Sequence, residues 1–357
     1  MSDLISEFIM NKPFLIPLQI ITVFIIGVLF SSCHLWKKPL LETKIDHQQQ
    51  ADAFEGTELQ QPDTSSDTSE DLNISNINLV SSTKSEDQLL FMQHIKEFLS
   101  DRIELFDQFI SAHLGVIVFK QVDGESIFTH NAEKCFIPAS LTKIVLCSTF
   151  IRMMEKESAE EDLSLAFKRE TLEMNWEHPS FRSLSYLFHQ INSYTFRQAQ
   201  HANQTANDLG KFIQKIFQNN TGIYENIEQI FLSHIDHISF VLPCNRIQKA
   251  SGLTLNNRLS PFQVADCMYH LKDKNIYVKS LMQAGEGTLT NRLKGIGDNH
   301  YFKTGSLKKN GVACLAGYLN LSEPLGIVIM INMLSENSFL DAVYWMDENI
   351  LKMVKLV

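Results

Sequence analysis

The 357-residue sequence lacks the short motifs that mark several classes of functional site. It has six cysteines but no Cys-x-x-Cys pair, which argues against a zinc ribbon or a thioredoxin-type redox site. It also has no His-Glu-x-x-His motif and no Gly-x-x-x-x-Gly-Lys-Ser/Thr loop. The sequence therefore predicts neither a zinc-protease helix nor a phosphate-binding loop.

Basic charge is also scarce. The chain has 31 lysines and arginines against 41 acidic residues, a net charge of −10. A nucleic-acid-binding protein would show a basic patch or stripe, so we expect no nucleic-acid partner. Most of the acidity lies in residues 42–86, which contain ten acidic residues against two lysines.

The N-terminal segment, residues 1–39, contains an uncharged run from Phe14 to Trp36. This run is long enough to span a bilayer, which needs about 20 apolar residues. Two interpretations stay open: an uncleaved transmembrane signal-anchor, or a lipoprotein signal segment that ends at a lipidated Cys33. Both predict membrane attachment and place the rest of the chain in the bacterial cell envelope, on the periplasmic side of a membrane.

Residues 40–86 have no hydrophobic periodicity and are rich in Ser, Thr, Asp, Glu and Gln. Such a segment cannot bury enough apolar surface to offset the entropy of ordering it. We therefore expect an acidic, disordered tether that leads to a single domain over residues 87–357.

Helical periodicity begins after Asp87, and strand-like runs lie at both ends of the domain with a mostly helical stretch, residues 144–240, between them. A last helix is expected over Phe339–Val354. This order predicts one α+β domain whose sheet joins N-terminal and C-terminal segments. The predicted strands are Leu114–Lys120, Ser126–His130, Tyr301–Leu307, Val312–Leu319 and Gly326–Met333.

A candidate nucleophile and base lie at the start of the helical stretch. Ser140 and Lys143 form a Ser-x-x-Lys motif in Pro138–Lys143, at the entry of a predicted helix. Residues three apart share a helix face, so Lys143 can reach the Ser140 hydroxyl. A serine is a weak nucleophile until a base removes its proton, and lysine serves as that base only when its pKa is lowered.

The run Lys303-Thr304-Gly305-Ser306 offers the second half of such a site. Lys303 would supply a nearby cation, which lowers the pKa of a lysine base. Gly305 would allow the substrate backbone to approach closely. The backbone N–H groups of Ser140 and Ser306 would stabilise an oxyanion.

These motifs resemble the penicillin-recognising serine enzymes, whose signature combines Ser-x-x-Lys, Ser-x-Asn and Lys-Thr-Gly. The sequence is most similar to short class C low-molecular-mass penicillin-binding proteins of the penicillin-binding protein 4 type, which are D-alanyl-D-alanine carboxypeptidases. The resemblance covers roughly residues 110–335 and includes Ala250–Pro261 and Gly287–Leu293.

The resemblance implies a β-lactamase/transpeptidase-like fold, an antiparallel sheet flanked by a helical region. It implies a serine hydrolase that acts on peptidoglycan stem peptides through a Ser140 acyl-enzyme, with β-lactam antibiotics as covalent inhibitors. Lys303 and Thr304 would hold the terminal carboxylate of the substrate. No metal and no organic cofactor is implied.

The middle motif departs from the family pattern, because Gln190–Arg197 has Thr195 in place of the serine and Arg197 in place of the asparagine. Thr195 keeps a hydroxyl for proton relay, and Arg197 could hold a substrate carboxylate. A register shift would make Ser193 the relay instead. Three functions stay open: a working carboxypeptidase or endopeptidase, a catalytically impaired homologue that binds peptidoglycan or regulates wall synthesis, and a β-lactamase or esterase.

Overall fold

The computed structural model describes residues 86–110, 112–157, 162–222, 225–233, 246–335 and 338–356, all within one compact unit, Leu79–Val357. The predicted anchor, residues 1–39, and the predicted tether, residues 40–86, lie outside these ranges except for Glu86. None of the helices in the described part of the chain is long and apolar enough to cross a membrane.

A five-stranded antiparallel sheet forms the centre of the domain, with the strands in the order β2-β1-β5-β4-β3. N-terminal and C-terminal segments pair where β1 meets β5, as the sequence predicts. The strands are β1 His113–Lys120, β2 Ser126–His130, β3 Tyr301–Leu307, β4 Val312–Leu319 and β5 Leu325–Asn332.

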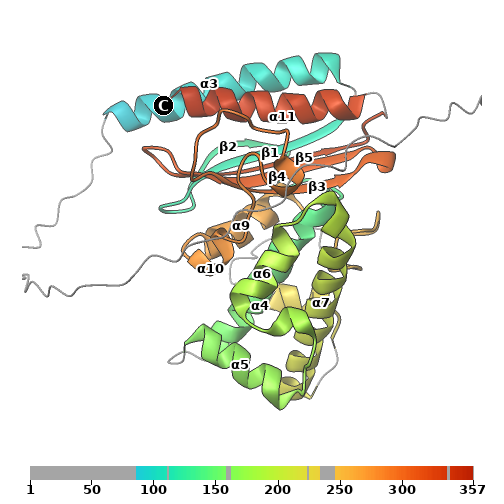
Figure 1. The fold of residues 1–357 in the computed structure, drawn as a ribbon. Coiled ribbons are helices and arrows are strands. Elements are labelled where there is room, and N and C mark those ends of the chain that lie inside the picture. The colour runs from blue at the N-terminus through green and yellow to red at the C-terminus, as the bar shows by residue number, and fades with distance from the viewer. Residues whose placement is uncertain are drawn as a thin grey trace, which may run out of the picture. The chain divides into compact units, whose positions relative to one another are not determined.

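Helices cover both faces of the sheet (Figure 1). The N-terminal helix α3 (Glu86–Phe109) and the C-terminal helix α11 (Ser338–Lys355) lie on one face and contact each other through Phe106 and Trp345, whose ring centroids are 4.9 Å apart. Because both faces are buried, β4 and β5 are apolar at nearly every position rather than alternating.

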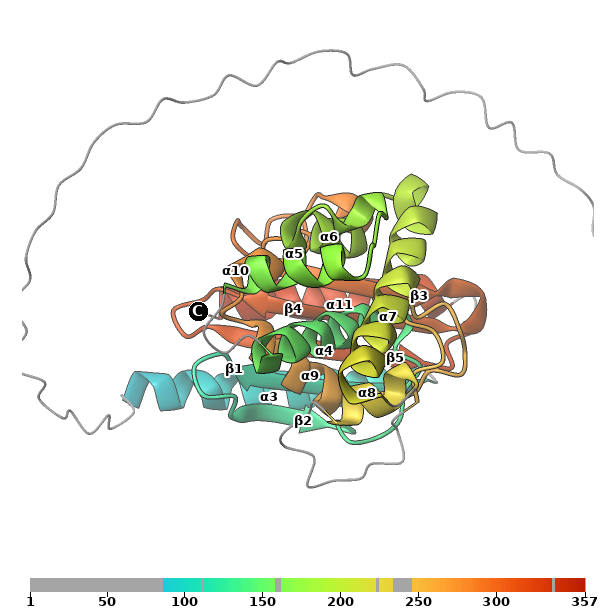
Figure 2. The ribbon, with the colours of Figure 1, turned by 90° about the horizontal axis from the view of Figure 1, so that it is seen from below.

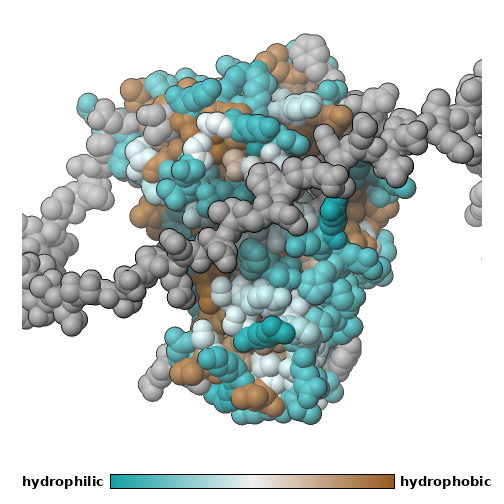
Figure 3. All heavy atoms as spheres, viewed as in Figure 1, coloured by the Kyte–Doolittle hydropathy of each residue, from teal (hydrophilic) through white to brown (hydrophobic). Residues whose placement is uncertain are grey.

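The helical region packs against the opposite face, where α9 contacts β1 and β5 and α4 packs on α9 (Figures 1 and 2). Its centre contains Phe150, which packs against the rings of Phe167, Phe188 and Phe212 with centroids 5.9–6.5 Å apart. In the view of Figure 3, most of the visible surface of this region is hydrophilic. The helices are α4 Thr142–Glu157, α5 Leu163–Glu173, α6 Leu184–Asn192, α7 Ala199–Thr221, α8 Ile227–Ser233, α9 Pro261–Leu271 and α10 Asn275–Val278.

The cysteines of the described residues divide into two kinds. Cys135 is disulfide-bonded, whereas Cys147, Cys267 and Cys314 are buried free thiols. Burial raises the pKa of each of these thiols to about 12, so they remain protonated and pack as small hydrophobic groups.

Candidate active site

Ser140 lies at the centre of a short 3-10 helix, Ala139–Leu141, which leads directly into α4. The preceding residue, Ala139, has φ +47°, a left-handed conformation that favours glycine. Non-glycine residues in this region store strain and cluster at functional sites. The side chain of Ser140 is only 7% exposed. The predicted helix entry is therefore present, with Ser140 on a strained turn ahead of the α-helix and Lys143 in its first turn.

A clamp segment, residues 246–260, holds this turn in place. Gly252 has φ +79°, and a Cβ there would lie 1.9 Å from the carbonyl oxygen of Ala139. The buried Asn257 donates a hydrogen bond to Thr142 Oγ1 at 3.1 Å, and Thr142 Oγ1 donates to the Ala139 carbonyl at 2.8 Å. The close approach of Gly252 and the hydrogen bond from Thr142 both involve the Ala139 carbonyl. Together they stabilise the left-handed conformation of Ala139.

Strand β3 meets the same turn from the other side. A Cβ on Gly305 would lie 2.8 Å from the Pro138 carbonyl oxygen and 3.1 Å from the Ser140 nitrogen. We expected this glycine to accommodate the substrate backbone. The structure shows that it accommodates the turn of residues 138–141, which carries Ser140 and is called the nucleophile turn below. The next residue, Ser306, is exposed and adjacent to this contact.

Two buried lysines lie close to one tyrosine ring. The Nζ atoms of Lys143 and Lys303 are 4.6 Å and 4.7 Å from the ring centroid of Tyr194. Lys303 Nζ also lies 3.5 Å from the Tyr194 hydroxyl oxygen. Lys303 reaches this face because its neighbour Phe302 packs in the core on the opposite face, and successive strand side chains alternate.

These groups change one another's ionisation. Burial, together with the charge of Lys303, lowers the pKa of Lys143 to about 8. Burial alone would raise the pKa of Tyr194, but the two ammonium groups and a hydrogen bond with the Ser140 side chain lower it to about 7. Tyr194 is therefore a phenol whose pKa lies near neutral pH, and Ser140 is one of the groups that lower it.

The next helix supplies an asparagine beside Lys143, although the middle sequence motif has Arg197 in place of the asparagine of the family pattern. Asn203, on α7, accepts a hydrogen bond from Lys143 Nζ through its Oδ1 at 2.8 Å. One turn later on α7, Asn207 Oδ1 accepts from the backbone N–H of Ser251 in the clamp segment at 3.0 Å. One face of α7 therefore orients both the candidate base and the clamp.

The structure does not bring Thr195 or Arg197 into this cluster, which corrects the expected placement of both. Thr195 is exposed and donates from its hydroxyl to Gln198 Oε1 at 3.1 Å. Arg197 is also exposed, in the 3-10 helix Phe196–Gln198. Helix α6 ends at Asn192, and the chain then turns so that Tyr194 rather than Thr195 faces the lysines. Ser193 is the C-cap of α6.

A signal for Tyr194 was present in the sequence. Two buried ammonium groups need a compensating charge or acceptor, and Tyr194 is the ionisable side chain nearest to the suspected relay. Asn203 had no comparable signal, because its role depends on how α7 crosses α4.

The remaining matched motifs have identifiable positions. Thr288 and Thr304 share a hydrogen bond of 2.6 Å between their hydroxyl oxygens, next to Lys303. Arg292 is bound by the α11 carboxylate Asp347, with a shortest N–O distance of 2.6 Å. Asn256 is exposed and donates to Gln248 at 2.8 Å, so it acts in the turn of the clamp segment.

No potential metal cluster of three or more His, Cys, Asp or Glu side chains occurs among the residues that the structure describes. The four groups that meet at this site are a hydroxyl, a phenol and two amines. Together they can activate a serine for acyl transfer and attract a carboxylate.

Comparison with known proteins gives one family match, to the D-Ala-D-Ala carboxypeptidase 3 (S13) family over residues 198–348. This range begins after Ser140, Lys143 and Tyr194 and includes Lys303. No curated protein was found to be similar to this chain.

Several solved structures are similar to the chain. Penicillin-binding protein 4 from Haemophilus influenzae, complexed with a β-lactam, is 12% identical with a TM-score of 0.48 and covers 71% of this chain and 99% of its own. A β-lactamase from Sphaerobacter thermophilus is 17% identical with a TM-score of 0.48, over 73% and 98%. Penicillin-binding protein D2 from Listeria monocytogenes, bound to cefotaxime, is 15% identical with a TM-score of 0.44, over 69% and 98%.

The five-stranded antiparallel sheet with its helical region confirms the predicted α+β class and the predicted antiparallel sheet flanked by helices. Residues 198–348 are therefore similar to the D-Ala-D-Ala carboxypeptidase 3 (S13) family.

Proposed function

We propose that this protein is a serine-type D-alanyl-D-alanine carboxypeptidase that acts on peptidoglycan stem peptides through an acyl-enzyme on Ser140. The observation that carries the proposal is the meeting of two buried lysines, Lys143 and Lys303, at the Tyr194 ring, with strand β3 lying against the turn of Ser140. The two ammonium groups lower the pKa of Tyr194 to about 7. Such a phenol accepts a proton at neutral pH without requiring a strongly basic group in the resting site.

The first step forms the acyl-enzyme. Tyr194, as the phenolate, accepts the Ser140 proton while Oγ attacks the carbonyl carbon between the two D-alanines. The C–N bond then breaks, and the leaving D-alanine takes the proton from Tyr194. Water later hydrolyses the ester and regenerates Ser140. Lys143, expected from sequence to be the base itself, instead stabilises the phenolate as a neighbouring cation, oriented by Asn203.

Two further elements would stabilise the reacting substrate. The backbone N–H groups of Ser140 and Ser306 would donate to the oxyanion, since β3 lies against the nucleophile turn at Gly305. Lys303 and Thr304 would hold the terminal carboxylate, and the bond from Thr288 would fix the Thr304 hydroxyl. Buried charge is effective here because little water competes for the carboxylate.

The location of the protein is part of the same proposal. We propose that the N-terminal segment holds the domain at the periplasmic side of a bacterial membrane, by a transmembrane helix or a lipidated Cys33. The disulfide at Cys135 supports an oxidising compartment outside the cytoplasm. β-Lactams would act as covalent inhibitors at Ser140.

The test uses the purified full-length chain and a peptidoglycan pentapeptide that ends in D-alanyl-D-alanine. We expect release of D-alanine from the natural chain and none from Ser140→Ala. If the natural chain releases no D-alanine and binds peptidoglycan as tightly as Ser140→Ala does, the protein is a non-catalytic wall-binding homologue and the proposed activity is wrong.

A further inference from the structure

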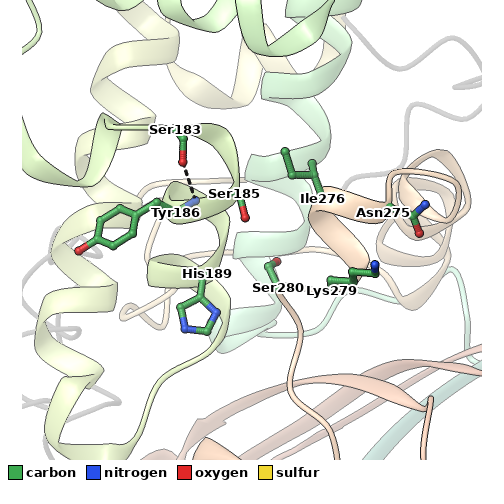
Figure 4. Close-up of a pocket in the computed structure, with 8 residues that line it drawn as sticks. All are labelled: Ser183, Ser185, Tyr186, His189, Asn275, Ile276, Lys279 and Ser280. Atoms are coloured by element: carbon green, nitrogen blue, oxygen red, sulfur yellow. Dashed lines mark hydrogen bonds between the residues drawn. The ribbon is translucent and has the colours of Figure 1, made fainter. Parts of the chain in front are cut away.

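A cavity outside the candidate active site lies in the helical region between α6 and α10, with a volume of about 530 Å³. This volume falls in the range of small-molecule sites. Figure 4 shows residues from α6 and from the α10 segment on its two sides, with Ser280 between them. The cavity is lined by Ser183, Ser185, Tyr186, His189, Asn275, Ile276, Lys279 and Ser280.

The lining favours a polar ligand with negative charge. It contains three serine hydroxyls, a phenol and an amide, together with the ammonium group of Lys279 and the imidazole of His189. It contains no carboxylate, although the whole chain carries a net charge of −10. A hydroxyl-rich lining with a lysine and no acidic group attracts an anion that also offers hydroxyl and amide groups.

The floor of the cavity is connected to the candidate active site. Ser280 is 3% exposed, donates to the Tyr277 carbonyl at 2.6 Å and accepts from Asn192 Nδ2 at 3.0 Å. Asn192 precedes Tyr194 by two residues, and two residues of chain span at most about 7 Å. The same Asn192 side chain lies beside the thiol of Cys147, four residues after Lys143 on α4.

We propose that this cavity binds the anionic glycopeptide portion of peptidoglycan, the muramyl sugar with its first stem residues, while the D-alanine end of a stem peptide occupies the Ser140 site. The inference rests on the proposed function, because it extends the substrate of that site. Hydroxyls and amides of the sugar match Ser183, Ser185 and Asn275, and a stem carboxylate matches Lys279. The exposed ring of Tyr186 offers an apolar surface at the rim.

The test is a calorimetric titration of the full-length chain with N-acetylmuramyl-L-alanyl-D-isoglutamine, which has a sugar and a carboxylate but no D-alanyl-D-alanine. We expect Lys279→Ala to weaken binding about tenfold, since a hydrogen bond to a charged group contributes about 1.5–3 kcal/mol. Ser185→Trp, which fills the cavity without changing its charge, should weaken binding at least as much. Lys215→Ala, which removes an exposed lysine on α7, is the matched control and should bind as the natural chain does.

Two further arms separate this proposal from the proposed activity. Ser140→Ala should bind the probe normally, so the titration gives its result even if the chain releases no D-alanine. For an active chain, Lys279→Ala should raise KM for a glycan-linked pentapeptide several-fold with kcat unchanged, and leave a short acyl-D-alanyl-D-alanine peptide unaffected. The assignment would be overturned if the natural chain did not bind the probe, if Lys279→Ala and Ser185→Trp bound it as tightly as the natural chain does, or if β-lactam acylation abolished binding.

Discussion

The nucleophile turn and the α6–α7 connection differ in how their functional residues are positioned. In the turn, Ser140 and Lys143 are three residues apart, and both lie where a helix entry predicts. In the connection, Tyr194 and Asn203 are nine residues apart and belong to different elements, and the exposed Thr195 and Arg197 lie between them. A motif within one element preserves its geometry, whereas a motif that crosses a loop depends on tertiary packing.

The difference identifies what each region contributes. The turn carries Ser140, and the clamp segment and Gly305 lie against it. The connection carries Tyr194, which lies close to both lysines, and Asn203, which accepts a hydrogen bond from Lys143. Variants in the connection should therefore change the rate and its pH dependence, while variants at the clamp should change the stability of the turn.

The largest effect should come from Tyr194→Phe, which keeps the ring beside the two lysines and removes the proposed proton acceptor. General-base catalysis contributes about 10²- to 10⁴-fold, so the acylation rate should fall by about that factor. The measurement is the rate of fluorescent-penicillin labelling of the full-length chain, with unfolding temperature as the control for folding. A loss below about threefold would leave Lys143 as the base.

Asn203→Ala should have the next largest effect, because it removes the acceptor of the Lys143 ammonium. A hydrogen bond to a charged group contributes about 1.5–3 kcal/mol, so acylation should slow by about 10- to 100-fold. The matched control is Asn207→Ala on the same helix face, which touches the clamp rather than Lys143. Equal rate losses for the two variants would show that Asn203 acts only by supporting the fold.

Gly252→Ala should lower the unfolding temperature of the domain, while the acylation rate of the molecules that remain folded changes little. The new Cβ would lie 1.9 Å from the Ala139 carbonyl oxygen, so the backbone of the nucleophile turn must shift. Gly297→Ala is the matched control, since Gly297 also has positive φ but no atom within 4 Å of the added Cβ.

Strained backbone conformations contribute about 1–3 kcal/mol each, and both glycine variants introduce one. The additional loss of unfolding temperature in Gly252→Ala, about 2–4 °C for each kcal/mol in a domain of this size class, isolates the clash. Thermal unfolding followed by circular dichroism measures it. Equal unfolding temperatures for the two variants would mean that Gly252 does not hold the turn.

The smallest effect should come from Thr195→Ala and Arg197→Ala. Both side chains are exposed, and exposed substitutions away from special features change stability by less than about 0.5 kcal/mol. Acylation rates should stay within about twofold of the natural chain. A tenfold loss in either variant would restore the role in relay or carboxylate binding that the sequence predicted.

The sequence predicted the sheet more completely than the site. The boundaries of β3 and β4 agree with the predicted runs, and the predicted last strand differs from Leu325–Asn332 by one residue at each end. Their short length and the polar or glycine residues that flank them favour strands over helices. Lys143 and Lys303, from distant parts of the sequence, lie close to the same tyrosine ring. The aligned pattern pointed to Thr195 rather than Tyr194 as the residue near the lysines, because alignment to a Ser-x-Asn pattern cannot show where α6 ends.

The measurement that tests the central claim most directly is the pH dependence of Ser140 acylation by a β-lactam, with the adduct located by mass spectrometry. The productive state has Tyr194 ionised, above its pKa of about 7, and Lys143 still charged, below its pKa of about 8. We predict a rate that rises through pH 7 and falls above pH 8, and loss of the acidic limb in Tyr194→Phe. A rate that keeps rising through pH 8 in both proteins, or an adduct on a residue other than Ser140, would contradict the account.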